Sequence, residues 1–206
     1  MESPNRKDIR RLSLTDFVEI VSKSGTPKAT KVRQVKDRPS YHPSADYYKQ
    51  IREAIVEIHR DNSTESILQN IATSTSPAKR ENYTAISDGY KKWHKKHNLT
   101  WFQPPDCLYE HSGIYISVNP ELGLFVENKP HLIKLYFKAE PLTKNRVEII
   151  THLMSNCLKT SSPPDTTMAI LDIRSSKLIF SLPTENKLNA LINAELVYIA
   201  ALWDEV

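Results

Sequence analysis

The chain has 206 residues, of which 39% are hydrophobic and 25% charged, and its formal net charge is +4. These values are ordinary for a globular protein and exclude wholesale disorder or a coiled coil. Because only 4 glycines are present and none are clustered, the chain holds neither a P-loop nor a dinucleotide-binding fingerprint. We expect one large domain, or a domain with an extension, that does not bind nucleotides by those routes.

The two cysteines, Cys107 and Cys157, lie far apart and lack Cys-x-x-Cys spacing. This spacing argues against a disulfide framework or a structural zinc site, and it is typical of a reducing compartment. Neither the polar segment 1–11 nor any later stretch has the apolar run of a signal peptide or a membrane span. The sequence therefore predicts a soluble cytoplasmic protein with no membrane partner.

Positive charge gathers in two segments, 23–38 and 90–97, whereas the last stretch, 185–206, is acidic. This separation is compatible with a polyanion as partner. The candidate nucleic-acid-binding residues are Lys28, Lys31, Arg33, Lys36, Arg38, Lys91, Lys92 and Lys95.

The first elements are predicted to be helical. Residues 1–11 are expected to form a frayed tail, followed by a short helix with Ser13 or Thr15 as N-cap and Gly25 as its stop. The segment 26–43 contains three prolines and is predicted to be a basic surface connector, because proline interrupts a long helix.

Three more helices follow the connector. "SADYYKQIREAIVEIHRDN" has apolar residues at helical spacing and Ser44 as its expected N-cap. Further helices are predicted around 65–73 and 78–97. In the last of these, the simplest interpretation is that Tyr90 and Trp93 are buried and the lysines are solvated, although aromatic and basic residues together are also typical of nucleic-acid binding.

The period changes to alternation after "LTWFQPPD", which predicts strands. "GIYISVN", Gly123–Glu127 and "HLIKLYFKA" are expected to be three strands joined by tight turns. A helix capped by Thr143 follows, then a hairpin about "RSS", and a last helix capped by Thr184. Its predicted apolar stripe comprises Leu188, Leu191, Ile192, Leu196, Ile199 and Leu202.

These elements predict an α+β fold in two parts. Residues 1–105 form a basic, mainly helical N-terminal part, and residues 106–206 form a mixed-sheet core in the order β-β-β-α-β-β-α.

This order, from about residue 110 to 203 and with a helix in front, resembles the core of the PD-(D/E)XK nuclease superfamily, in particular its RecB-like branch. Pro120-Glu121 stands where that family has Pro-Asp, and the strand "LIKLYFKAEPLTK" stands where it has an acid-x-Lys strand. If Lys138 is aligned with the family lysine, Tyr136 occupies the position of the acid. If Lys134 is aligned instead, Leu132 occupies it. The resemblance therefore lacks its second carboxylate.

The resemblance implies either a metal-dependent nuclease or a relative that binds nucleic acid without cutting it. For an active enzyme, Glu121 is expected to bind Mg²⁺ or Mn²⁺, with Glu57 or Glu53 as the helix-borne acid. Lys134 or Lys138 would then position the attacking water. None of the seven histidines shows metal-ligand spacing.

Two alternatives remain open from the sequence. Lys134, Tyr136 and Lys138 share one strand face, which is either a phosphate-binding strip or the solvated face of an antiparallel sheet. Because the motif lacks an acid, the whole chain is alternatively a non-enzymatic interaction or regulatory module. Its acidic final helix could then meet the basic N-terminal segment, another subunit of a homo-oligomer, or another protein.

Overall fold

The computed structural model describes residues 10–38, 46–180 and 187–206, and it confirms the predicted α+β class. The helices are α1 (Leu14–Val21), α2 (Gly25–Lys36), α3 (Lys49–Arg60), α4 (Ser66–Ser74), α5 (Pro77–His94), α6 (Lys144–Leu158) and α7 (Lys187–Glu205), with a short 3-10 turn at Lys159–Ser161. The strands are β1 (Arg11–Ser13), β2 (Leu99–Phe102), β3 (Cys107–His111), β4 (Ile114–Val118), β5 (Leu122–Val126), β6 (Lys129–Tyr136), β7 (Thr167–Asp172) and β8 (Lys177–Phe180).

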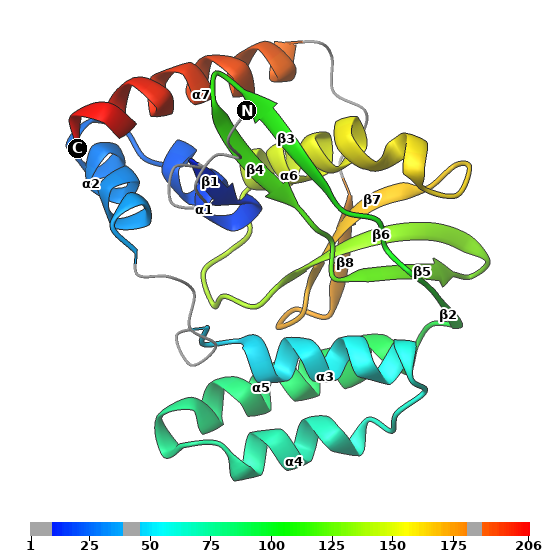
Figure 1. The fold of residues 1–206 in the computed structure, drawn as a ribbon. Helices are drawn as coiled ribbons and strands as arrows, with labels where there is room; N and C mark the ends of the chain where they lie inside the picture. Colours follow the sequence, from blue (N-terminus) through cyan, green and yellow to red (C-terminus); the bar gives the residue numbers. More distant parts are fainter. Residues whose placement is uncertain (1–9, 39–45, 181–186) are drawn as a thin grey trace, which may run out of the picture.

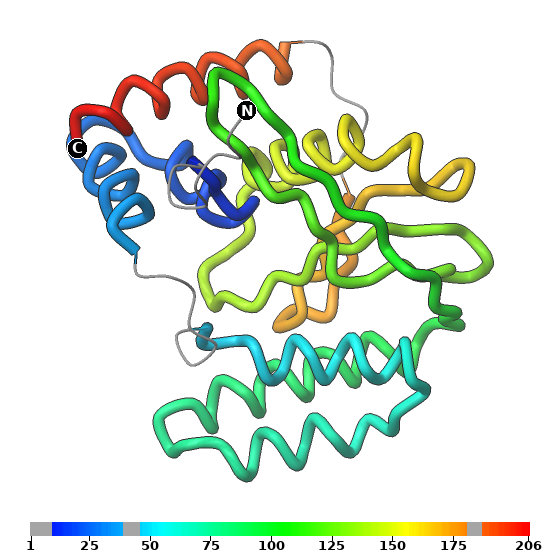
Figure 2. The backbone as a smooth tube through the Cα atoms, in the orientation of Figure 1, coloured from blue at the N-terminus to red at the C-terminus, as the bar shows by residue number. Residues whose placement is uncertain are grey.

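The strands form two sheets. The larger is mixed and has the order β2-β5-β6-β7-β8, with β6 and β7 parallel and connected through α6. The smaller has the order β1-β4-β3, with β1 parallel to β4. Figure 1 shows α3, α4 and α5 on one side of the larger sheet and α6, α7 and the smaller sheet on the other, and the tube in Figure 2 follows the same path.

Two hydrophobic cores lie on opposite faces of the larger sheet. Along β6, Leu132 belongs to the core shared with α1, α6 and α7, whereas Ile133 and Leu135 belong to the core shared with α3, α4 and α5. In β7, Met168 and Ala169 divide in the same way. Because both faces are covered, β7 carries a continuous apolar run from Met168 to Leu171, and β6 buries the adjacent residues Leu132 and Ile133 on opposite faces.

Local signals set several helix boundaries as predicted. Ser13 caps α1 by accepting a hydrogen bond from the backbone N–H of Asp16, and Thr143 caps α6 by accepting one from Arg146. These side chains satisfy N–H groups that have no partner inside the helix. The predicted caps Ser44 and Thr184 lie outside the described residues.

The predicted connector is wrong over 26–36, because the chain forms α2 there, beginning at Gly25. Pro27 lies in the first turn of this helix. Backbone N–H groups in the first turn have no intrahelical acceptor, so a proline there costs no helical hydrogen bond. The helix ends at Lys36, before the next proline. A proline in the first turn is thus compatible with a helix, although we expected the prolines of this segment to prevent one.

Three short strands were not predicted, namely β1, β2 and β3. The predicted meander of three strands is also wrong, because β4 pairs with β1 and β3 whereas β5 pairs with β2 and β6. Each pairing of β1 or β2 joins segments that are far apart in sequence, so no local turn pattern announces it.

Helix α5 approaches the turn between β7 and β8 very closely at Gly89. A Cβ atom at this position would lie 2.1 Å from the carbonyl oxygen of Ile173, which is too close for any side chain. Ser176 reinforces the contact by donating a hydrogen bond of 2.8 Å to the Gly89 carbonyl. Glycine is therefore required here by packing, although it lowers intrinsic helix propensity.

Helices α3, α4 and α5 share a polar network inside their apolar contacts. His59 is 8% exposed and forms a hydrogen bond with the Tyr90 hydroxyl, while His94 Nδ1 lies 2.5 Å from Glu65 Oε1. Burial and the neighbouring His94 lower the pKa of His59 to about 4. Burial and the charge of Glu65 raise the pKa of Tyr90. His59 is therefore neutral in the folded protein at neutral pH.

Because His59 is buried and neutral, we expect the folded protein to lose stability in acid at pH values well above the pKa of ordinary carboxylates. An unfolded chain protonates His59 near pH 6.5, whereas the folded chain protonates it near 4, so the stabilisation present above the first value is lost as the pH falls towards the second. The free energy of unfolding should drop by about 2 kcal/mol between about pH 8 and about pH 5. Urea titrations at several pH values measure this change.

His59→Gln, which keeps a hydrogen-bonding side chain beside Tyr90, should flatten the dependence between these pH values. His111→Gln, at the end of β3, is the matched control and should leave it unchanged. An equally steep loss of stability in the His59 variant would contradict the assignment.

Candidate functional site

Glu121 and Lys134, which the sequence proposed as catalytic residues, lie together in an ion pair. Lys134 Nζ is 2.6 Å from Glu121 Oε1, and the two side chains are only 12% and 14% exposed. Lys134 also donates to the carbonyl of Asn119 at 2.9 Å. The backbone N–H of Leu135 donates to Glu121 Oε2 at 2.9 Å. Both carboxylate oxygens and the ammonium group are therefore engaged within the protein.

The strand register brings this pair together. Glu121 directly precedes β5, and Leu122 lies opposite Ile133 in the antiparallel β5–β6 ladder. Lys134 is consequently the next residue along β6. Neighbouring ends of an antiparallel pair place such residues within side-chain reach, although they are separated by a hairpin in sequence.

The residues around Glu121 do not fit the divalent metal that the resemblance implies. Within the described ranges, no group of three or more His, Cys, Asp or Glu side chains could hold a metal ion. Glu57 instead accepts a hydrogen bond of 3.1 Å from Ser63, and Glu53 lies 3.7 Å from Lys49. A hard cation requires several oxygen ligands, and here an ammonium group already neutralises the central carboxylate.

Lys134 and Tyr136 of β6, and Lys138 just after its end, lie on one side of the sheet, where they are only partly exposed. Together with Glu19 of α1 and Arg146 of α6, they line a small hollow of about 40 Å³. The interpretation of this face as solvated is therefore wrong, because helices cover both sides of the mixed sheet.

Glu19 is the acidic partner of two lysines that the sequence analysis proposed as functional, Lys138 as catalytic and Lys31 as nucleic-acid-binding. It forms ion pairs with Lys138 and, at 2.6 Å, with Lys31. Burial alone would raise the pKa of Glu19, but hydrogen bonds from Lys138 and Lys31 outweigh it and hold the pKa below its ordinary value. Neither lysine is left as a free cation for a polyanion.

Most of the basic residues of α2, and Arg38 just after its end, are likewise engaged by acidic or carbonyl groups of the same chain. Lys28 is 7% exposed and lies 2.8 Å from Glu195 of α7. Arg38 forms two hydrogen bonds with Asp16, at 2.8 and 3.1 Å. Lys36 donates to the carbonyls of Trp203 and Val206 at the end of α7, where a cation also complements the helix dipole.

The acidic last helix and the basic N-terminal segment therefore meet within one molecule, as one of the alternatives anticipated. Arg33 of α2 is exposed, and among the described residues it is in no ion pair. The α5 lysines are placed differently, because Tyr90 and Trp93 are buried while Lys92 and Lys95 are exposed, as the simplest interpretation predicted. Lys91 lies 3.3 Å from the amide oxygen of Gln69.

A polar cleft of about 320 Å³ lies beside Glu121, between α3 and the strands. Arg60 of α3, Arg11 of β1 and Trp101 of β2 line it, and Asp106 and Glu121 contribute carboxylates. Arg11 Nε donates to Ser117 at 2.6 Å, and the exposed Arg60 forms two hydrogen bonds with Asp61. Two guanidinium groups and a half-buried indole thus border one cavity.

Sequence reasoning missed Arg11 and Arg60 as members of one site. They are separated by 49 positions in the sequence. Arg60 stands outside the two basic segments, and Arg11 ends the segment 1–11, which was expected to be a frayed tail. Trp101 belongs to β2, and the pairing of β2 with β5 brings it to this cleft.

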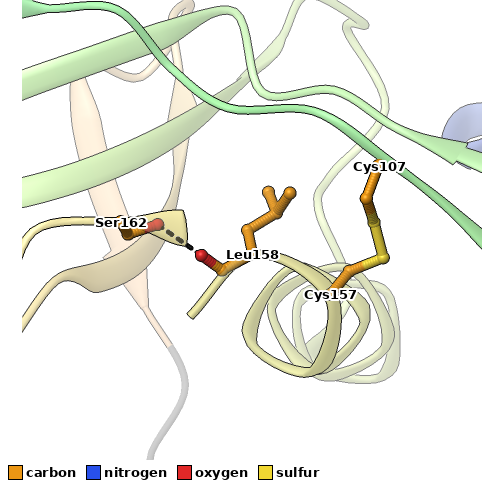
Figure 3. The surroundings of a disulfide bond; sticks show 4 residues. All are labelled: Cys107, Cys157, Leu158 and Ser162. Atoms are coloured by element: carbon orange, nitrogen blue, oxygen red, sulfur yellow. Dashed lines mark hydrogen bonds between the residues drawn. A yellow bond between two sulfur atoms is a disulfide. The ribbon is translucent and has the colours of Figure 1, made fainter. Parts of the chain in front are cut away.

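The same cleft is bordered by Cys107, which forms a disulfide with Cys157. Figure 3 shows the bond connecting the strand that carries Cys107 with the end of the helix that carries Cys157. The Cα atoms are 6.2 Å apart, within the normal range for a disulfide. Ser162 secures the end of this helix by donating to the Leu158 carbonyl at 2.6 Å.

This disulfide corrects the prediction that Cys107 and Cys157 are not joined in a disulfide. A separation of 50 positions conceals their proximity, because β3 packs on α6 only in the folded chain. The pairing also removes the reason for which the cysteines were assigned to a reducing compartment.

Comparison with protein-family models, with curated proteins and with solved structures finds no match to this chain. In the part of the chain that the structure describes, no helix is long and apolar enough to span a membrane.

Proposed function

We propose that the protein binds single-stranded nucleic acid without cutting it. In this proposal it is a relative of the PD-(D/E)XK nucleases in which Lys134, rather than a metal ion, lies against the carboxylate of Glu121. The observation that carries this proposal is the polar cleft in which Arg11, Arg60 and Trp101 meet. Guanidinium groups bind phosphates bidentately, and an indole ring offers a stacking surface to any base. The cleft therefore combines the two kinds of contact that such a ligand requires.

The ion pair beside the cleft supports binding over cleavage. In the nuclease family, a carboxylate at the position of Glu121 holds a metal. Here Lys134 places an ammonium group 2.6 Å from that carboxylate, and the Leu135 N–H engages its other oxygen. The pair stabilises the junction between β5 and β6. Although Asp106 also lines the cleft, Glu121 is already neutralised by Lys134, which disfavours a two-carboxylate metal site for phosphoryl transfer.

Fluorescence anisotropy with labelled single-stranded DNA and RNA tests the binding site. Arg60→Gln and Arg11→Gln should each weaken binding about tenfold and reduce the salt slope by about 1, because each removes a phosphate contact. Trp101→Ala should weaken binding by about 1 to 3 kcal/mol, because it removes the ring on which a base would stack. Asp61→Asn, which releases Arg60 from its partner, should strengthen binding.

Lys92→Gln and Lys95→Gln are matched controls, because they remove the same charge from the exposed surface of α5. Losses as large in these controls as in the arginine variants would move the binding surface to α5. Absence of binding to either nucleic acid at low salt would overturn the proposal in favour of the interaction-module alternative. Incubation with Mg²⁺ or Mn²⁺ should leave the bound strand intact, and cleavage abolished by Glu121→Ala would overturn the assignment of Lys134.

A further inference from the structure

Strand β8 is an edge of the larger sheet whose outer side is unpaired. Among the described strands it pairs only with β7, in an antiparallel ladder. In such a ladder, alternate residues turn their N–H and C=O groups towards the partner, and the others turn them away. No other described element forms a hydrogen bond with the backbone of β8. This edge therefore offers free donors and acceptors to an extended chain.

A hollow of about 450 Å³ lies along this edge. All of β8 lines it, together with Trp93 of α5 and His97 just after the end of that helix. Leu178 packs against the core shared with α5, whereas Ile179 packs against the core on the other face of the sheet. A space that touches both residues lies at the edge of the sheet and not on one face only. A strand added to β8 would occupy this space.

The wall of the hollow contains polar groups that lack a partner. Trp93 is 1% exposed, and its indole N–H has no hydrogen-bond acceptor among the described residues. A buried donor without an acceptor costs free energy, and an occupant that supplies a carbonyl oxygen would remove that cost. His97 donates through Nδ1 to the Trp93 carbonyl at 2.8 Å, and no described group forms a hydrogen bond with its Nε2. A peptide amide, which is both donor and acceptor, matches these two groups.

The rim of the hollow is basic. Lys177 lines it and is exposed, and Lys96, which is also exposed, directly precedes His97. Unlike Lys28 and Lys31 of α2, neither of these lysines forms an ion pair within the described ranges. Between them the lining is apolar and includes Leu178, Ile179 and Phe180, of which Phe180 is 58% exposed. The charge and the apolar floor together complement a segment in which acidic and apolar residues alternate.

We propose that an extended acidic segment of another protein binds to the outer side of β8 as an additional strand. Its backbone extends the ladder, its apolar side chains pack on Leu178 and Phe180, and its carboxylates lie near Lys177 and Lys96. The site is preformed, because Ser176 fixes the β7–β8 turn on α5 through its hydrogen bond to the Gly89 carbonyl. The inference does not depend on nucleic-acid binding, since the hollow and the polar cleft share no residue.

NMR spectroscopy of the isotope-labelled protein tests the site, with a heptapeptide of alternating valine and glutamate as the probe. The peptide should shift the indole N–H signal of Trp93, which is assigned by its loss in Trp93→Phe. It should also slow amide hydrogen exchange in β8 about tenfold at saturation, because the outward N–H groups become bonded. The same peptide with every backbone nitrogen methylated keeps its charges but cannot donate to the ladder, so it should bind about tenfold more weakly or worse.

Charge variants test the basic rim. Lys177→Gln and Lys96→Gln should each weaken binding of the valine–glutamate peptide about threefold, and both together about tenfold, because exposed ion pairs contribute modestly. Lys129→Gln removes the same charge from an exposed position on β6 and is the matched control, which should have no effect. A peptide of alternating valine and lysine should not bind.

Unchanged Trp93 and β8 signals at millimolar concentrations of the valine–glutamate peptide would overturn the proposal. Equal binding of the methylated peptide would also overturn it, because charge alone would then hold the peptide. Signals that move with protein concentration alone would assign the edge to a second copy of the chain, and signals moved by single-stranded DNA instead of the peptide would assign it to nucleic acid. Arg60→Gln should leave peptide binding unchanged, which separates this test from that of the polar cleft.

Discussion

Replacing Cys107 and Cys157 with serine should lower the free energy of unfolding by about 4 kcal/mol. The disulfide closes a loop with a sequence separation of 50, and the loss of unfolded-chain entropy in a loop of that size accounts for about that amount at 25 °C. The bond also connects β3, in the smaller sheet, to α6, which packs on the larger one. Its removal should loosen the wall of the polar cleft that Cys107 borders.

Urea unfolding of the wild type with and without a thiol reductant measures this contribution. The reductant should destabilise the wild type about as much as the double substitution does, and it should have no effect on the double variant, which is the control. Two free thiols detected in the unreduced native protein would contradict the pairing.

Lys134→Met should destabilise the protein by about 3 kcal/mol, because it leaves the nearly buried Glu121 carboxylate without its cation. Removing one member of a buried ion pair is more disruptive than removing both. Glu121→Gln combined with Lys134→Met should therefore be more stable than the sum of the two single changes predicts. Chemical denaturation of the four proteins in this double-mutant cycle gives the coupling energy.

Lys129→Met is the matched control, since Lys129 lies in the same strand and is exposed. It should change stability by less than about 0.5 kcal/mol. If Lys134→Met were equally mild, the ion pair would have no structural role, and a different explanation would be needed for the positions of Glu121 and Lys134.

Local chemistry made the long elements predictable. The apolar spacing of α3, α5 and α7 and the caps of α1 and α6 act within a few residues, as does the hairpin formed by β7 and β8. The strands β1 and β2 were missed because they are 3 and 4 residues long and pair with distant partners. Such short segments have no periodicity to recognise.

The candidate site was predictable only in part. The pattern around Pro120 selected Glu121 and Lys134 for one candidate site, and a buried lysine on this strand was expected to need an acidic partner such as Glu121, which is the ion pair that the fold forms. The charge density of 23–38 suggested a polyanion surface. In the folded chain, Lys28 and Lys31 instead pair with Glu195 and Glu19, because acidic residues far away in sequence are brought beside them.

By itself, the sequence determined the α+β class, most helices and the succession of elements along the chain from β4 to α7, because hydrophobic period, caps and turns are local properties. Tertiary structure alone decided which charges remain available, which cysteines are bonded, and that Arg11, Arg60 and Trp101 border one cleft. It also decided that Leu191 faces outward. The reason is physical: ion pairs, disulfides and cavities depend on distances between atoms, and residues that are remote along the chain acquire those distances only through packing.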